Sequence, residues 1–286
     1  MLQKLLPGSL KKIVTGFFVL VLFVGAKRSQ STEILWKQID TGLYAAEIDG
    51  PHVSKYSDSK VSLLKINPSY FNFELVVSTQ HDSILRTIKD WCDLQKLEGA
   101  INAGMYSLKD HISGMGYMQN YDHINNPKVK NDFNALAVFN PKNVSSPAFQ
   151  IVDMANQDWK AILQNYNSCF QSIRMIDNTG TPVYWQHKPV LRCSMTVLAT
   201  DNSGNVLFLF TRSPYSVNEI IDLMLKSPLD IQTAMYLEGG PEASLYAKTA
   251  DAEIIKFGSY VSRTHPTDDN VELRKMPNLL GIRKKQ

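Results

Sequence analysis

The sequence predicts an α+β fold, a single domain with a mixed, mainly antiparallel sheet and helices packed on it. Short apolar segments bounded by turn residues outnumber the helical segments, and several connections have hairpin length. Strands and helices do not alternate regularly, and the chain has neither a Rossmann glycine fingerprint nor a phosphate loop. With 286 residues, 44% of them hydrophobic and 20% charged, the chain can bury a substantial core.

The first 26 residues have the pattern of a secretory signal peptide. A short basic stretch precedes an apolar run over residues 13–26, which ends in the small residues that suit signal-peptidase cleavage. The run is shorter than the ~20 residues of a comfortable bilayer span, and the alternative is an uncleaved anchor. Both interpretations predict that residues 27–286 form an exported domain, periplasmic or secreted, which would contact the membrane only through the N-terminal segment and only if that segment is uncleaved.

Charge argues against a nucleic-acid partner. The net charge of +3 arises from Lys4, Lys11 and Lys12, since removing them from the 30 basic side chains leaves 27, equal to the 27 acidic ones. A neutral body lacks the cationic surface that phosphate neutralisation requires. The histidines and cysteines show no metal-ligand spacing, so we expect neither a metal nor a cofactor. The three cysteines are expected to be buried thiols, although export would permit one disulfide.

The N-terminal half is expected to begin with two strands, Val61–Ile66 and Phe71–Ser78, joined as a hairpin by the turn residues 67–69. Ser83 can cap a helix that places Ile84, Ile88, Trp91 and Cys92 on one face. Further apolar runs predict strands at Ala100–Ala103, Ala135–Phe139 and Phe149–Val152, and helical spacing predicts a helix at Asn156–Gln164.

The C-terminal half is expected to contain strands at Ser172–Ile176, Cys193–Thr200, Val206–Thr211 and Thr233–Leu237, with a tight turn at residues 202–205. Ser216 and Glu219 match a capping box, which predicts a helix that runs to about Leu225. The basic tail, residues 281–286, is expected to be a solvated end.

Three segments carry candidate functional residues. Asn102 and Gly104 follow a buried strand, where glycine allows a ligand to approach the backbone. Arg192 opens a strand, where its guanidinium can fork onto a carboxylate or phosphate. The third segment runs from Glu238 through Gly239 and Gly240 to Glu242 and Ser244, and its glycine amides could form an anion-binding nest. Taken singly, each has a plain alternative: a turn, a surface ion pair and a structural loop.

The order of these segments resembles the phosphodiester glycosidase family. Asn102–Tyr106 is similar to the family's Asn-Ala/Gly-Gly segment, and Arg192–Thr211 to its Arg-started strand and hairpin. The capped helix at Ser216–Leu225 and the loop at Leu237–Ser244 complete the resemblance, which spans roughly residues 95–250. Glu238 stands where the family usually has Asp, which moves the carboxylate one methylene further from the backbone.

The resemblance implies hydrolysis of a sugar-1-phosphodiester, with a carbohydrate or glycan phosphodiester as substrate. It implies that Arg192 and the amides of Gly239 and Gly240 stabilise the leaving phosphate. Glu238, or Glu242 as second choice, would act at the anomeric carbon. Asn102 would hold sugar hydroxyls or phosphate oxygens, with Gly104 and Ser244 as further substrate-binding candidates. The alternatives are a non-catalytic glycan-binding protein on the same fold and a hydrolase of cell-envelope phosphodiester polymers.

Overall fold

The computed structural model describes residues 33–286, which belong to one compact unit. The predicted signal segment lies outside this range, so that interpretation stays a prediction. No helix within residues 33–286 combines the length and the hydropathy needed to span a bilayer.

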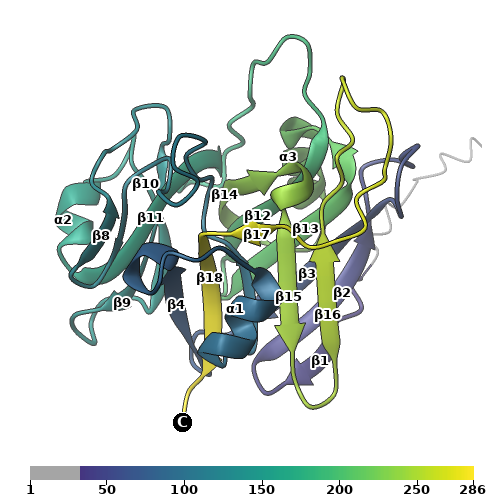
Figure 1. Ribbon diagram of the computed structural model, residues 1–286. Coiled ribbons are helices and arrows are strands. Elements are labelled where there is room, and N and C mark those ends of the chain that lie inside the picture. The colour runs from purple at the N-terminus through teal and green to yellow at the C-terminus, as the bar shows by residue number, and fades with distance from the viewer. Residues whose placement is uncertain (1–32) are drawn as a thin grey trace, which may run out of the picture. The chain divides into compact units, whose positions relative to one another are not determined.

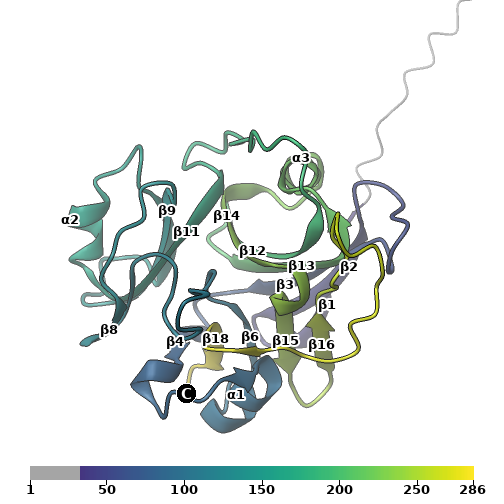
Figure 2. The same ribbon diagram turned by 45° about the horizontal axis from the view of Figure 1, so that its top comes forward.

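Two antiparallel sheets dominate the described part of the chain, and they lie in separate layers (Figures 1 and 2). The larger has the order β1-β2-β3-β13-β12-β14-β11-β7-β8, with β9 paired to β11 and β10 paired to β9. Its strands are β1 (Lys37–Asp40), β2 (Leu43–Asp49), β3 (Lys60–Ile66), β7 (Met118–Asn120), β8 (His123–Asn126), β9 (Ala135–Pro141), β10 (Phe149–Asp153), β11 (Tyr166–Ile176), β12 (Cys193–Asp201), β13 (Val206–Tyr215) and β14 (Ile231–Gly239).

The smaller sheet has the order β16-β15-β6-β18-β4. Its strands are β4 (Phe71–Val77), β6 (Gly99–Asn102), β15 (Ser244–Lys248), β16 (Glu253–Phe257) and β18 (Asn278–Lys284), while β5 (Arg86–Thr87) pairs separately with β17 (Lys275–Met276). The helices are α1 (Ile88–Gln95), α2 (Trp159–Leu163) and α3 (Val217–Lys226), with short 3-10 turns η1 (Ser78–Gln80) and η2 (Gly240–Glu242). The predicted α+β class with a mainly antiparallel sheet is confirmed.

The main core lies between the two sheets. Leu64 and Phe208 of the larger sheet pack in one buried cluster with Phe73 and Leu280 of the smaller sheet. Burial of this apolar surface is the main force that holds the sheets together. Figure 2 shows α3 on the far side of the larger sheet and α1 on the far side of the smaller one. The capping box that starts α3 is confirmed, because Ser216 accepts from the Glu219 amide and Glu219 bonds back to Ser216.

The predicted hairpin between residues 61 and 78 is wrong, although both strands and the turn between them are present. β3 pairs with β2 and β13 in the larger sheet, whereas β4 pairs with β18 in the smaller one. Val61, Leu63 and Leu64 are all buried, as expected of an interior strand with apolar contacts on both faces. The turn therefore carries the chain from one sheet to the other.

Two boundaries also differ from expectation. Thr87, not Ser83, caps α1 by accepting from the Asp90 amide, and Ile84 is exposed. The C-terminal tail is not a solvated end over its whole length, because residues 281–284 belong to β18, which pairs with both β6 and β4. Ile282 is fully buried there, and Arg283 pairs with Glu74. The end of the chain is therefore an interior strand of the smaller sheet.

Candidate active site

The candidate site lies where strands of both sheets end together. β14 ends at Gly239, η2 follows, and β15 begins at Ser244. Glu238 is the register partner of Thr196 in β12, and the Thr196 hydroxyl lies 3.2 Å from the side-chain oxygen of Asn102, the last residue of β6. The η2 turn thus connects the two sheets at the point where the predicted carboxylates and the predicted amide come together.

Asn102 holds this turn in place. Its side-chain oxygen accepts from the Ser244 backbone amide at 2.8 Å, and its side-chain nitrogen donates to the Glu242 carbonyl at 3.0 Å. The residue is only 2% exposed, so its amide is occupied by the protein itself. In this structure Asn102 positions Glu242, and the role in holding sugar hydroxyls that the resemblance implies stays a prediction.

Asn102→Ala is expected to destabilise the fold. It would leave the buried Ser244 N–H without its partner and remove one of the two side-chain hydrogen bonds to the Glu242 carbonyl, and an orphaned buried group costs about 1–3 kcal/mol. We expect the free energy of unfolding to fall by about 2–4 kcal/mol, measured by denaturant titration. The matched control is Asn143→Ala, at an exposed position, which should change little. Equal stability of Asn102→Ala and the wild type would contradict the positioning role.

Glu238 is a partly buried carboxyl that has no ion-pair partner within residues 33–286. Burial raises its pKa to about 8, against the hydrogen bond that its Oε1 accepts from the Gly239 amide, and the charge of Glu242 raises the pKa further. Glu238 is therefore protonated at neutral pH. A carboxyl in this state can donate a proton, and it does not repel an anionic ligand.

The raised pKa of Glu238 should appear in the pH dependence of stability. Between its ordinary value of 4.5 and the folded value of about 8, the folded state binds more protons than the unfolded state. The Glu238 contribution to stability is therefore lost as pH rises through this window. Glutamine does not titrate, so Glu238→Gln lacks this loss of stability. The unfolding free energy of the variant minus that of the wild type should therefore increase from about pH 5 to about pH 8. Parallel stability curves for the two proteins would show that the pKa is not raised.

One amide of the predicted anion-binding nest already has a protein partner. The Gly239 amide donates to the Glu238 carboxyl at 3.0 Å. Gly240 has a φ of 67°, and a Cβ on Gly239 would lie 2.1 Å from the Tyr236 hydroxyl, so both positions need glycine for the shape of the turn. The two glycines thus give the turn the shape that positions the acidic side chains, and the anion-binding role of the Gly240 amide stays a prediction.

Ser244 and Gly104 also lie close to this support. Ser244 is fully buried, and its hydroxyl donates to the Glu242 carbonyl at 3.2 Å. Gly104 has a φ of 75°, and a Cβ there would lie 3.3 Å from the backbone oxygen of Gln171 in β11. Their described contacts are therefore structural.

Arg192 does not lie beside Glu238 and Glu242 but contacts α3. Its guanidinium donates to Glu219 of α3 at 2.9 Å, and it lines a different hollow, together with Tyr56 and Arg263. Burial opposes ionisation of Glu219, but the bonds from Arg192 and Ser216 outweigh it and lower the pKa of Glu219 to about 2. The plain alternative, a surface ion pair, describes Arg192 better than the phosphate role implied by the resemblance.

The cavity beside Glu242 contains a different arginine, Arg274, which the sequence did not single out. Arg274, Glu242 and Tyr106 line a cavity of about 320 Å³, whose remaining walls come from Glu272, Leu273 and Lys275. The Arg274 guanidinium lies 5.0 Å from the Tyr260 ring centre, and its Nε is buried with no hydrogen-bond partner within the described chain. The Arg274 guanidinium as a whole has no hydrogen-bond or ion-pair partner within residues 33–286, so its terminal nitrogens are free to bind an anion in the cavity.

The charges around Tyr106 show that these groups share one electrostatic environment. Burial raises the pKa of Tyr106 to about 12; Glu242 and Glu238 raise it as well, and Arg274 lowers it. The site therefore combines a protonated carboxyl, a second acid, a phenol and a free guanidinium. No group of three or more His, Cys, Asp or Glu side chains in residues 33–286 is arranged to hold a metal ion.

Comparison with known proteins places the chain in a family. The sequence profile described as phosphodiester glycosidase matches residues 95–283. The chain belongs to the phosphodiester glycosidase family. The match extends beyond residue 250 and so includes Arg274 and most of β18. A search of curated protein sequences finds no match.

Two solved structures share the fold of this phosphodiester glycosidase family member. A hypothetical protein from Synechocystis superposes with a TM-score of 0.60 at 12% identity, over 89% of this chain and 64% of that one. This chain thus spans just under two thirds of that protein's length. The catalytic domain of zebrafish N-acetylglucosamine-1-phosphodiester alpha-N-acetylglucosaminidase, auto-inhibited by pro-peptide, gives 0.57 at 10% identity over 88% of each chain. At these identities the likeness establishes the fold alone.

Proposed function

We propose that the protein hydrolyses a sugar-1-phosphodiester, breaking the bond between the anomeric carbon and the phosphate oxygen. The observation that carries the proposal is the cavity that unites the unpaired guanidinium of Arg274 with the carboxylate of Glu242, beside the protonated carboxyl of Glu238. The family membership supports the same reaction class. Export is proposed from the N-terminal pattern, which would place the substrate outside the cytoplasm.

Each group has a physical role in this reaction. Arg274 binds the phosphate oxygens and stabilises the charge that grows on them as the bond to the anomeric carbon breaks. Glu238 is neutral at neutral pH, so it tolerates the phosphodiester anion and gives its proton to the departing oxygen. Glu242 stabilises the positive charge at the anomeric carbon and takes the proton of the attacking water. Asn102 keeps Glu242 in place through its backbone carbonyl.

A release assay on a panel of sugar-1-phosphodiesters, including N-acetylglucosamine-1-phosphodiesters, tests the proposal. We expect free reducing sugar and phosphomonoester in equal amounts, because the bond breaks on the sugar side of the bridging oxygen. Formation of sugar-1-phosphate would show that the other ester bond of the phosphodiester, the one to the alcohol, breaks instead, and would overturn the proposed reaction. Binding without product would support the glycan-binding alternative, and release from envelope polymers alone would support the third interpretation.

A further inference from the structure

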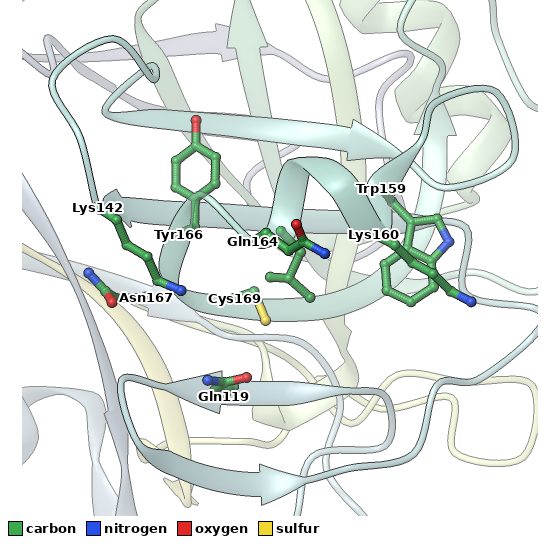
Figure 3. A pocket seen from close by; sticks show the side chains of 9 residues that line it. Gln119, Lys142, Trp159, Lys160, Gln164, Tyr166, Asn167 and Cys169 are labelled. Carbon is green, nitrogen blue, oxygen red and sulfur yellow. The ribbon is translucent and has the colours of Figure 1, made fainter.

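A second cavity, of about 240 Å³, lies beside α2 and β11 of the larger sheet (Figure 3). It shares no lining residue with the cavity that contains Arg274. Figure 3 shows Lys142 and Asn167 at one end, Trp159 and Lys160 at the other, and Cys169 between them. The remaining walls come from Gln119, Leu163, Gln164 and Tyr166.

The charge of this second cavity favours an anion. Both lysines are exposed, and neither ammonium has an ion-pair or hydrogen-bond partner within residues 33–286, although the Lys160 ammonium lies 5.7 Å from the centre of the Trp159 ring. The described residues that line the cavity include no Asp or Glu. The nearby carboxylate of Asp158 lies outside the lining and caps α2 by accepting from the Ala161 amide. Two uncompensated positive charges at one small hollow produce a local field that attracts an anion.

The other side chains favour a sugar as the carrier of that anion. Trp159 packs part of its ring against the buried cluster of Leu136, Val138 and Cys169, and lines the cavity as well. An indole face suits the apolar face of a pyranose, because it offers a large rigid contact area. The side-chain amide of Gln164 makes no hydrogen bond within the described residues, so it is free for a sugar hydroxyl. The cavity is smaller than the ~300–1,000 Å³ typical of drug-sized ligands, which suits a single monosaccharide unit.

We propose that this cavity is an accessory binding site for one anionic monosaccharide unit, a sugar phosphate or a uronic acid. Trp159 stacks on the ring, Gln164 bonds a hydroxyl, and Lys142, at the end of the cavity away from Trp159, binds the anionic group, while Lys160 adds positive charge beside the ring. This proposal is argued from the residues of the second cavity alone and does not depend on the proposed hydrolase activity. If the substrate is a polymer, this site gives the protein a second point of attachment, which strengthens binding without a new catalytic contact.

The test is a calorimetric titration of the full protein with glucose 6-phosphate, glucuronate, glucose and inorganic phosphate. We expect saturable binding of one or both anionic sugars, weaker binding of glucose, and weaker binding of inorganic phosphate. The double variant Lys142→Ser/Lys160→Ser should bind the anionic sugars at least about tenfold more weakly, the effect of losing ~1.4 kcal/mol of charge interaction. Its matched control is Lys37→Ser/Lys128→Ser, at two exposed lysines outside the cavity.

The proposal is overturned if neither anionic sugar binds saturably. It is also overturned if inorganic phosphate binds with equal affinity, which would indicate an anion site without sugar recognition. Unchanged affinity in the Lys142/Lys160 variant would place the ligand elsewhere. The same titration on Glu238→Gln separates the two proposals, since accessory binding should persist there even if turnover is lost. Trp159→Phe, which keeps a ring against the core, should weaken the sugar ligands and leave inorganic phosphate unchanged.

Discussion

Glu238→Gln is expected to lower kcat on a sugar-1-phosphodiester by about 10²–10⁴-fold, the usual contribution of a positioned general acid. Glutamine keeps the shape of the side chain and an oxygen that can accept from the Gly239 amide, but it has no acidic proton to give. Since burial makes Glu238 neutral at neutral pH, the substitution changes the charge of the site little. The loss should therefore appear in kcat, with KM nearly unchanged, in a reducing-sugar release assay.

The control for this prediction is Glu253→Gln, at an exposed carboxylate in β16 outside the cavity. It should retain wild-type kinetics, because an exposed pair contributes little. In the wild type, kcat should decline above about pH 8, where Glu238 loses its proton. Wild-type turnover in Glu238→Gln would remove Glu238 from the mechanism, and a rate that rises through pH 8 would make it a base in place of an acid.

The strands around the site could be predicted because their signals are local. The turn at residues 202–205 joins β12 and β13 as expected, and the capping box of α3 uses atoms three residues apart. Strand pairing is a long-range property. The predicted pairing of β3 with β4 was wrong because β3 is an interior strand of the larger sheet, with apolar contacts on both faces. β18 lies between β6 and β4, whose residues are about 180–210 positions earlier in the chain, and no local pattern in residues 278–284 encodes those partners.

The same contrast between local signals and long-range packing applies to the site residues. The sequence identified Asn102, Arg192 and Glu238 by type and place, but the direction of each side chain depends on what folds against it. Asn102 turns toward η2 because the Ser244 amide and the Glu242 carbonyl need partners, and Arg192 turns toward the carboxylate of Glu219. Arg274 belongs to no motif and gains its importance only when β17 brings it beside Glu242.

Arg274→Lys is expected to lower kcat/KM by about 10²–10³-fold, similar to the loss of one donor that stabilises charge in a transition state. The lysine keeps the positive charge, but a single ammonium cannot reproduce the two parallel bonds of a guanidinium to phosphate oxygens. The Arg274 guanidinium has no hydrogen bond to lose within the described residues, and a lysine ammonium can keep a cation near the Tyr260 ring, so the fold should tolerate the change. Circular dichroism and thermal unfolding should therefore match the wild type while the release assay does not.

Arg192→Lys is the matched comparison, because both residues are arginines near strand starts and only one faces the cavity. Arg192 bonds to Glu219, and this partly exposed pair contributes about 0–1 kcal/mol, so its replacement should leave kcat/KM near the wild-type value. A large loss in Arg192→Lys together with an active Arg274→Lys would return the phosphate role to Arg192. Loss in both would mean that α3 and the β17 segment act on one substrate, with the phosphodiester reaching across both hollows.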